Sequence, residues 1–374
     1  MARRDLARRA RSLGLNVLIV IAPLVLAVAA SMVVIQAAGA PPIEAFRALA
    51  QGALGGRVEI GRTISFILPL TLVALAWIVA FTARRINVGF EGQMVLGGIA
   101  ATVVGLHVGG LPRPAHILAA SVVAALAGAA WVGIAAWLWA RHGVNEIIST
   151  LLLNFIALEL LGWLVRGPLK EPKTVFPRSP TLPGSVRWPP LLEQTALSWD
   201  IVLVPVVVAA VWFGLRRTSF GFGLRMTGAN PELARHMALP TRRISSLALL
   251  ISGAIAGLAG GSLVIGTGTG RLSDGFSSGF GFDGIVVALV ARNSPVGSVL
   301  AAFLFAILRS GAGLMESSTN LPLELVLITQ GLVIVLVSSS VFVLEWARNR
   351  RAGAAAQPER PAPAPAEETR QAGG

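Results

Sequence analysis

Residues 63–83 read TISFILPLTLVALAWIVAFTA, an uninterrupted stretch without a charged side chain that is followed directly by Arg84 and Arg85. A helix needs about 20 apolar residues to cross the hydrocarbon core of a bilayer. Similar stretches recur along the 374-residue chain, in which 54% of residues are hydrophobic, 13% are charged and the mean hydropathy is +0.73. Soluble chains carry roughly 25% charged residues. The sequence therefore predicts an all-α polytopic membrane protein and argues against a soluble enzyme or a disulfide-stabilised secreted domain.

The apolar segments predict about ten transmembrane helices in a lipid bilayer. They are centred on residues 13–38, 63–83, 91–108, 115–140, 147–165, 201–215, 244–265, 274–291, 296–311 and 322–343. The segment 201–215 is short and 274–291 begins with many Gly and Ser residues, so both are expected to extend into flanking residues or to be partly re-entrant. The predicted domains are a basic cytoplasmic N-terminus (1–12), a transmembrane domain (13–345) and a cytoplasmic tail (346–374). The tail is rich in Pro and Ala and is expected to be disordered.

Arginine placement predicts that both termini lie in the cytoplasm. The N-terminus MARRDLARRAR holds five arginines, and six more lie in the predicted inner loop 216–243. Positive charge is retained on the cytoplasmic side of membrane proteins. This topology accounts for the net charge of +13 and the pI of about 11.7, so no nucleic-acid partner is expected. The absence of cysteine excludes a disulfide framework, a thiolate nucleophile and a cysteine-based metal site.

Motifs of ATP hydrolysis and of common enzymes are missing from the sequence. There is no G-x-x-x-x-G-K-[ST] motif, and the two lysines, Lys170 and Lys173, both lie in the predicted outer loop 166–200. The four histidines do not cluster, and neither H-E-x-x-H nor G-x-S-x-G occurs. We therefore expect no catalytic residue, no metal and no cofactor bound directly by this chain. Ionisable residues in or near spans keep a proton-coupled carrier open as an alternative; they are Glu159, Asp283, Arg309 and Glu324.

The segment GANPELARHMALPTRR, which begins at Gly228, predicts a short capped helix over 231–238. Asn230 is a favourable N-cap, Pro231 suits the first helical position, and Glu232 places negative charge at the helix N-terminus. Pro240 ends the helix near Leu239. A helix of about two turns is marginal alone and needs a partner surface, which a cytoplasmic ATPase would supply. An ordinary amphipathic interfacial loop is the other interpretation.

Six segments, in order over about residues 60–345, resemble those of ATP-binding-cassette (ABC) importer permeases. They are NVGFEGQMVLGG from Asn87, VNEIISTLLLN from Val144, GANPELAR from Gly228, SGAIAGLAGG from Ser252, GFGFDGIVVALV from Gly279 and QGLVIVLV from Gln330. The chain is similar to the branched-chain amino acid, ribose and nucleoside permease superfamily, and within it to the nucleoside and simple-sugar branch. This resemblance implies a transport subunit in the bacterial inner membrane rather than an enzyme.

The resemblance also implies the partners of the chain. They are a separate cytoplasmic ABC ATPase that binds and hydrolyses ATP, a second permease subunit or a copy of this chain, and a periplasmic or lipoprotein substrate-binding protein. The expected cargo is a nucleoside, with a simple sugar second and a branched-chain amino acid third. Alternating access would move the solute by differential affinity between two states. An intramembrane enzyme would need a convergent catalytic cluster, which the sequence lacks.

Carried over by position, the resemblance assigns roles to two segments. The ATPase-docking residues would be Gly228, Asn230, Pro231, Glu232, Ala234 and Arg235, with Glu232 and Arg235 as the polar contacts. The segment from Asn87 would form a tight turn that opens a helix, with its motif residues Asn87, Gly89, Glu91, Gly92 and Gln93. Contact with substrate or a purely structural role remains open for this turn, and we favour the structural role.

Candidate residues of the translocation path are the polar or aromatic side chains within spans: Asn154, Glu159, Phe282, Asp283 and Gln330. Asn154 and Glu159 are five positions apart, so they project about 140° apart and cannot share one narrow helix face. Asp283 beside Phe282 would suit a polar, ring-bearing solute; the alternatives are a satisfied acid at a helix start or a partner for Arg309. The glycines at 253, 257 and 261 form one helical stripe, which we interpret as a packing surface.

Overall fold

The computed structural model describes residues 25–26, 28–266, 270–319, 328 and 331–332. Among these residues the regular elements are helices, and the only strand-like pairs are the isolated bridges Arg178–Ser273 and Pro190–Ser198. The helices belong to one compact unit, Ala30–Ile334. They are α2 (Pro42–Leu54), α3 (Arg57–Thr82), α4 (Phe90–His107), α5 (Arg113–His142), α6 (Glu146–Arg166), the 3₁₀ turn η1 (Trp199–Val202), α7 (Leu203–Arg217), α8 (Ser219–Ala229), α9 (Pro231–His236), α10 (Thr241–Ile265), α11 (Phe280–Val290) and α12 (Gly297–Thr319). The all-α prediction is confirmed for this part of the chain.

Six helical stretches in the described residues are long and apolar enough to cross a membrane. They are α3, α5, α6, η1 with α7, α10 and α12. The stretch Val28–Ala37 and α2 together would make a seventh, but they meet at a bend of 118°. Our predicted count of ten spans is therefore not confirmed. The prediction 322–343 falls almost entirely outside the described residues, as does the first half of 13–38, and so does the tail.

Two predicted segments differ from the helices observed. The prediction 274–291 is corrected to the 11-residue α11, because the Gly- and Ser-rich residues 274–279 form turns and Gly279 adopts a left-handed conformation with φ of 83°. The prediction 296–311 was too short, since α12 continues to Thr319. Helix α2 was not predicted. Its sequence PIEAFRALAQGAL has 13 residues and includes Glu44 and Arg47, so it is too short and too polar to be recognised as a membrane span.

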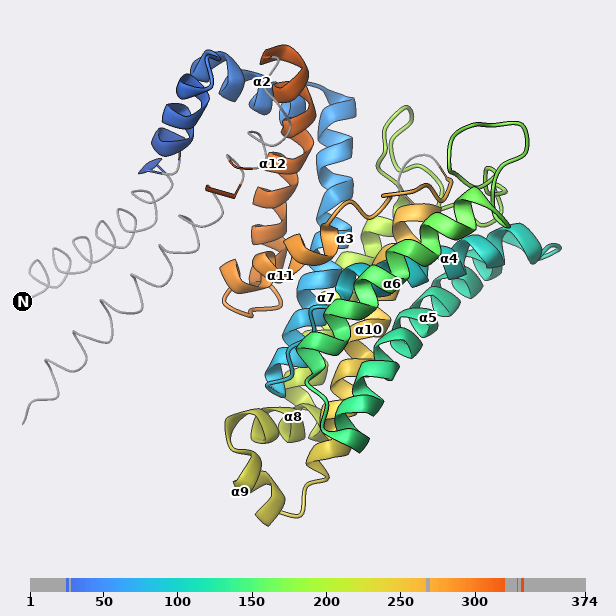
Figure 1. Cartoon of the computed structure of the whole chain (residues 1–374), viewed down its shortest axis with the longest axis vertical. Coiled ribbons are helices and arrows are strands. Elements are labelled where there is room, and N and C mark those ends of the chain that lie inside the picture. The colour runs from blue at the N-terminus through green and yellow to red at the C-terminus, as the bar shows by residue number, and fades with distance from the viewer. Residues whose placement is uncertain (1–24, 27, 267–269, 320–327, 329–330, 333–374) are drawn as a thin grey trace, which may run out of the picture. The chain divides into compact units, whose positions relative to one another are not determined.

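Helix α10 lies at the centre of the unit and packs against α3, α4 and α5 (Figure 1). Its glycine stripe contacts α5: a Cβ atom added to Gly257 would strike the carbonyl oxygen of Ala124, and one added to Gly253 would strike that of Gly128. On another side of α10, a Cβ on Gly260 would strike the backbone of Met94 in α4. The glycines therefore let three helix backbones touch, which confirms the packing interpretation.

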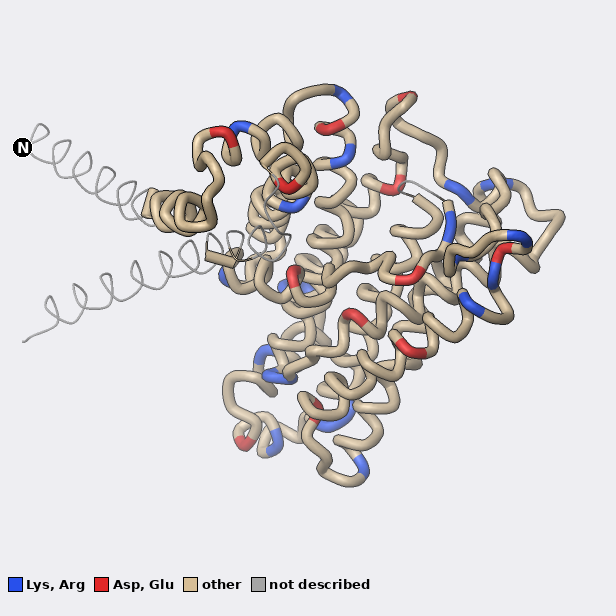
Figure 2. The backbone as a smooth tube through the Cα atoms, turned by 45° about the horizontal axis from the view of Figure 1, so that its top comes forward, with Lys and Arg blue, Asp and Glu red and all other residues tan. Residues whose placement is uncertain are grey.

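Charged residues gather near the two ends of the helices (Figure 2). One end carries α8 and α9, which lie beyond the ends of α5, α6 and α10 (Figure 1); we call it the α9 end. At the opposite end the long loop after α6 is attached to the 270–274 segment, because Glu171 bonds Arg271 at 2.5 Å. Glu171 also bonds Arg178 of its own loop at 2.8 Å. The hydrogen bond from Arg271, with that from Arg178, lowers the pKa of Glu171 below its ordinary value.

The glycine contacts predict a position-specific cost of adding one methyl group. Gly257→Ala should destabilise the protein by about 1–3 kcal/mol, because backbone atoms of α5 cannot move aside as a flexible side chain would. Gly214→Ala in α7 is the matched control, since a Cβ there has nothing within 4 Å. Melting temperatures of the purified proteins in one detergent check this. An equal effect of the two substitutions would contradict the close-packing explanation.

Candidate functional site

The turn between α3 and α4 is held by side-chain hydrogen bonds in the interior of the bundle. Asn87 is fully buried, and its amide bonds Gln93 in both directions, at 2.9 and 3.1 Å. Its nitrogen also donates to the hydroxyl of Ser252 in α10 at 3.0 Å, and its oxygen accepts from the backbone NH of Gly89 at 2.9 Å. Asn87 therefore closes the turn and attaches it to α10.

Glu91, in the first turn of α4, binds the segment that leads into α11. One carboxyl oxygen accepts from the Ser277 hydroxyl at 2.6 Å and from the Gly279 backbone NH at 3.0 Å, and the other accepts from the Gly281 NH at 2.8 Å. These donors lie 186 to 190 residues away in sequence. Glu91 is only 4% exposed, so a buried acidic side chain is satisfied wholly by protein donors.

Asn154 in α6 completes this polar cluster, which consists of Asn87, Glu91, Gln93 and Asn154. Its oxygen accepts from the Gly92 NH at 2.8 Å, and its nitrogen donates to the Val88 carbonyl at 2.9 Å. The amide of Asn154 is thus engaged by the backbone of the turn, and its assignment to a solute path stays a prediction. The cluster as a whole supports the structural role that we favoured for the Asn87–Gln93 motif.

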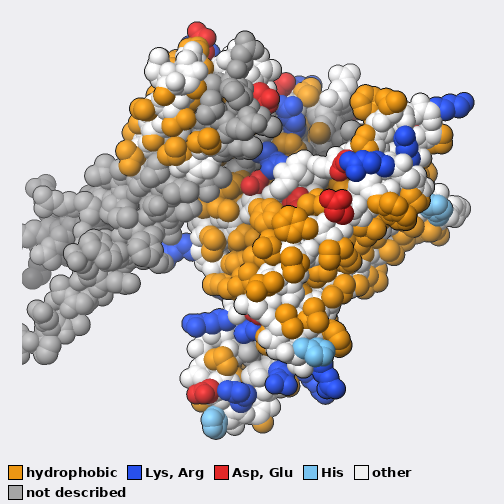
Figure 3. All heavy atoms as spheres, in the orientation of Figure 1, with side chains coloured by type: hydrophobic (Ala, Val, Ile, Leu, Met, Phe, Trp, Pro, Cys, Tyr) orange, Lys and Arg blue, Asp and Glu red, His pale blue; other side chains and the backbone are white. Residues whose placement is uncertain are grey.

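Glu159 lies on a different face of α6 from Asn154, as the spacing of five residues predicted. It is exposed, and the exposed side chains near it on the helix are apolar: Leu152, Phe155, Ile156 and Trp163. Figure 3 shows that hydrophobic side chains cover much of the bundle seen from this side. Within the described residues no cation pairs with Glu159. A single carboxylate thus stands in an otherwise apolar, unpartnered helix face.

Asp283 in α11 pairs with Arg309 of α12 at 2.5 Å. The same guanidinium lies 3.9 Å from the centroid of the Phe280 ring and donates to the Ser278 carbonyl. The expected pairing with Arg309 is therefore observed, while contact of Asp283 with a solute stays a prediction. The ring near the pair is that of Phe280, while Phe282 is 46% exposed and takes no part in it. The remaining candidate, Gln330, lies outside the described residues.

Helix α9 forms where it was predicted, although it ends at His236 rather than at 238. The Asn230 side chain accepts from the backbone NH groups of Glu232 at 3.1 Å and Leu233 at 3.0 Å, which confirms the N-cap. Of its six residues only Ala234 is buried. Leu233 is 47% exposed, and Met237 just beyond the helix is 49% exposed. Glu232 and Arg235 approach each other at 3.9 Å on the exposed surface.

Sequence reasoning missed several residues that complete these arrangements, namely Ser252, Ser277 and Phe280. Serine and phenylalanine within apolar segments are common and carry no local signal of a distant partner. The Gly- and Ser-rich composition of 274–281 was a usable signal, since an open backbone offers NH donors to a buried acid. Among the described residues no group of three His, Cys, Asp or Glu side chains is placed to hold a metal ion.

The hydrogen bonds of Glu91 predict that removing its charge destabilises the protein. Glu91→Gln replaces one acceptor oxygen by an NH₂ group that would face a backbone NH or a hydroxyl, and should cost about 1–3 kcal/mol. Glu159→Gln is the matched control and should leave the melting temperature unchanged, because Glu159 is exposed. Limited proteolysis of the 270–281 segment should accelerate in the first variant alone. Equal melting temperatures for wild type and Glu91→Gln would contradict this account.

Comparison with known proteins identifies the family. The family described as "Branched-chain amino acid transport system / permease component" matches residues 60–338. A glucose ABC transporter permease of Haloferax volcanii is 35% identical over 84% of this chain and 85% of its own. A guanosine ABC transporter permease of Bacillus subtilis is 33% identical over 87% of this chain and 94% of its own. A nucleoside ABC transporter permease of Lactococcus lactis is 28% identical over 84% and 88%.

These matches cover the turn cluster, α9 and the glycine stripe of α10, so the structural features described above lie within the shared region. The apolar helices make the chain a multi-pass membrane protein. The chain belongs to the family of branched-chain amino acid transport system permease components, and it is a permease subunit of an ABC importer.

Proposed function

We propose that this permease imports a nucleoside across the bacterial inner membrane. A simple sugar is the second candidate cargo. It would work with a second permease subunit, two cytoplasmic ABC ATPases and a substrate-binding protein, and ATP would act only on the ATPases. The cargo preference is supported by relatives named for guanosine and nucleosides, while another relative is named for glucose. The observation that carries the partnership with an ATPase is the geometry of α9.

Helix α9 has the features of a docking element. A helix of six residues is unstable by itself in water. Here it is held by the Asn230 cap and by the buried Ala234, yet it leaves Leu233 and Met237 exposed four positions apart on one face. Exposed apolar side chains beside charged ones suit a protein interface. We therefore assign the exposed face of α9 to the ATPase, with Glu232 and Arg235 as its polar contacts.

Gly228 and Ala234 have a different part in this proposal from the docking role first expected, because both are buried. A Cβ on Gly228 would strike the carbonyl oxygen of Thr82, so α8 lies directly against the end of α3. Helix α10 begins at Thr241, shortly after α9. A displacement of α9 by the ATPase would therefore reach α3 through α8, and α10 through the short connection at Pro240.

The arginines at the α9 end support an orientation in which this end faces the cytoplasm. Those near the helix termini there are Arg84, Arg85, Arg141, Arg216, Arg217, Arg225, Arg242 and Arg243. Retention of positive charge on the cytoplasmic side favours this orientation. It agrees with an ATPase on α9 and a substrate-binding protein at the opposite end, where the loop after α6 lies.

The exposed face of α6 is proposed to line the translocation path together with the second permease subunit. A lone carboxylate facing lipid is costly, and such residues normally face a water-filled cavity or a partner. Glu159 stands in this position between the aromatic side chains Phe155 and Trp163. A carboxylate between aromatic rings suits a polar solute that contains a ring and hydroxyl groups, because it offers both hydrogen-bond acceptors and stacking surfaces.

Charge reversal on α9 tests the coupling. Glu232→Arg and Leu233→Asp should each weaken ATPase binding about tenfold or more, because central interface residues contribute about 2 kcal/mol or more. Solute uptake should fall with it while the permease still inserts. Glu193→Arg and Val175→Asp, at exposed residues of the loop after α6, are matched controls for ATPase binding alone, because this loop lies at the end proposed for the substrate-binding protein. Co-purification of the ATPase and uptake into vesicles are the measurements, and normal values for both α9 variants would rule out the coupling role.

Transport by the assembled importer tests the cargo. Proteoliposomes that contain this permease with its companion subunits should take up radiolabelled guanosine only in the presence of ATP. Excess unlabelled adenosine or uridine should compete, whereas glucose should not. Uptake of labelled glucose that no nucleoside inhibits would assign the sugar instead. Uptake by this chain alone, without any ATPase, would favour a proton-coupled carrier.

A further inference from the structure

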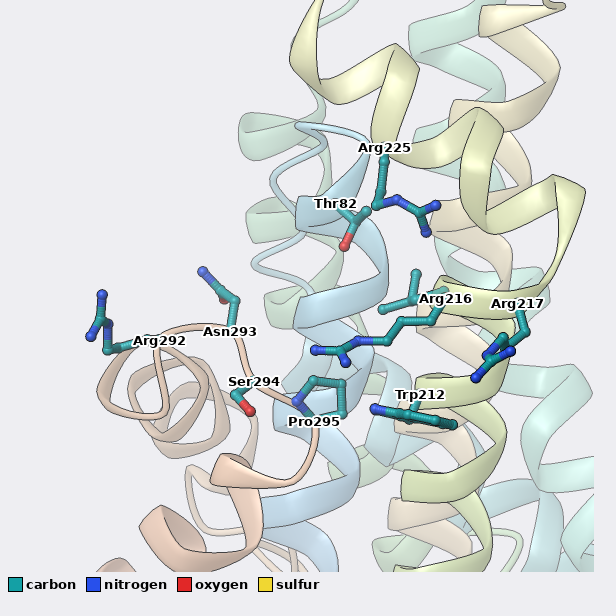
Figure 4. A pocket seen from close by; sticks show the side chains of 10 residues that line it. Thr82, Trp212, Arg216, Arg217, Arg225, Arg292, Asn293, Ser294 and Pro295 are labelled. Carbon is teal, nitrogen blue, oxygen red and sulfur yellow. The ribbon is translucent and has the colours of Figure 1, made fainter.

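A basic pocket of about 670 Å³ opens at the α9 end, between the ends of α3 and α7, helix α8 and the loop before α12 (Figure 4). Four arginines line it, Arg216, Arg217, Arg225 and Arg292, and its ten lining residues include no Asp or Glu. Arg216 reaches from α7 toward the loop at Ser294 and Pro295, while Arg225 comes from α8 beside Thr82 (Figure 4). The four arginines come from α7, α8 and the loop before α12, and Arg292 lies apart from the other three in this view.

Three of these arginines have unused hydrogen-bonding capacity. In the part of the chain that the structure describes, the guanidinium groups of Arg216, Arg217 and Arg225 make no hydrogen bond or ion pair with protein. The single contact recorded for them is that of Arg216 with the ring of Trp212, 5.6 Å from its centroid. Asn293, Ser294 and Thr82 add neutral hydrogen-bonding groups to the lining. Such a donor-rich, acid-free pocket fits an anion with several oxygens, above all a phosphate group.

An apolar groove of about 480 Å³ shares Trp212 with the basic pocket. Its walls are residues of α7, including Val204, Val208 and Ala209, and residues beside the start of α12, Val296 and Val299. Val296 directly follows Pro295 of the basic pocket. Tryptophan is typical of the membrane–water interface, where its ring spans apolar and polar surroundings. The basic pocket therefore continues into a groove along a membrane-facing helix.

We propose that the basic pocket and the apolar groove together bind one anionic phospholipid, with its phosphodiester among the arginines and an acyl chain along α7. Basic pockets between transmembrane helices on the cytoplasmic side are suited to anionic lipid head groups. A free phosphate would satisfy the arginines but would leave the groove empty, and the continuity of the two at Trp212 favours the lipid. The bound lipid would connect α7, α8 and the loop before α12, next to the element that carries α9.

The first experiment tests whether the complete wild-type chain prefers an anionic head group to a neutral one. Delipidated protein in neutral detergent is titrated with dioleoyl phosphatidylglycerol or dioleoyl phosphatidylcholine, and bound lipid is counted by native mass spectrometry. Phosphatidylglycerol should bind about tenfold or more tightly than phosphatidylcholine, because each arginine near the anionic group strengthens binding severalfold. Equal binding of the two lipids overturns the proposal.

Variants then locate the site. Arg216→Gln, Arg217→Gln and Arg225→Gln combined should remove the preference for phosphatidylglycerol. The matched control combines Arg141→Gln, Arg242→Gln and Arg243→Gln, which removes the same charge from exposed arginines outside the pocket and should keep the preference. If both triple variants lose the preference for phosphatidylglycerol equally, the lipid is attracted unspecifically by surface charge, and the proposed site is wrong.

A substitution in the apolar groove distinguishes binding of a lipid from binding of a free anion. Ala209→Trp fills the groove and should weaken phosphatidylglycerol binding, while Val206→Trp, which is exposed on α7 outside the groove, should not. Neither variant should change the binding of inorganic phosphate, measured by isothermal titration calorimetry. If phosphate binds as tightly as the lipid and Ala209→Trp has no effect on lipid binding, the pocket takes a free anion and the lipid proposal fails.

Discussion

Direct contact between helix backbones at the glycines of α10 is the constraint on which the rest of this permease depends. Where Gly257 meets α5 and Gly260 meets α4, a side chain of any size would separate the helices. In a bilayer the hydrophobic effect does not drive helices together, so close van der Waals contact has to do so. The same helix carries Ser252, which binds Asn87. Helix α10 therefore positions the turn that opens α4 as well as the helices around it.

The polar cluster at that turn connects α4 with α6, α10 and α11. Glu91 links the start of α4 to the start of α11, and Asn154 links α4 to α6. In apolar surroundings each of these hydrogen bonds has no water to compete with it, and each unsatisfied group would be costly. The cluster also stabilises the non-helical residues 274–279 inside the transmembrane unit. Glu91 accepts from the Ser277 hydroxyl and the Gly279 NH, so these buried donors need no helical partner.

Two features of the α9 end adjoin each other. Helices α8 and α9 form a short elbow against the end of α3, and the basic pocket lies at the junction of that elbow with α7. Arginines occur in both: Arg235 lies on the exposed face of α9, and Arg216, Arg217 and Arg225 line the pocket. In the proposed assembly, the ATPase would contact α9 while the anionic lipid contacts the adjoining α7 and α8.

Local sequence determined those parts of the protein that depend on neighbours in the chain. Apolar runs fixed the positions of α3, α5, α6 and α10, and Asn230 with Pro231 fixed the start of α9, because span length and helix capping are local effects. The glycine stripe of α10 was visible for the same reason. Only the tertiary structure decided that Asn154 faces the turn while Glu159 faces outward, that Asp283 pairs with Arg309, and that Glu91 binds residues 186 to 190 positions away. Helical periodicity gives the angle between two side chains on one helix, but which face meets a neighbouring helix follows from the packing of the whole bundle.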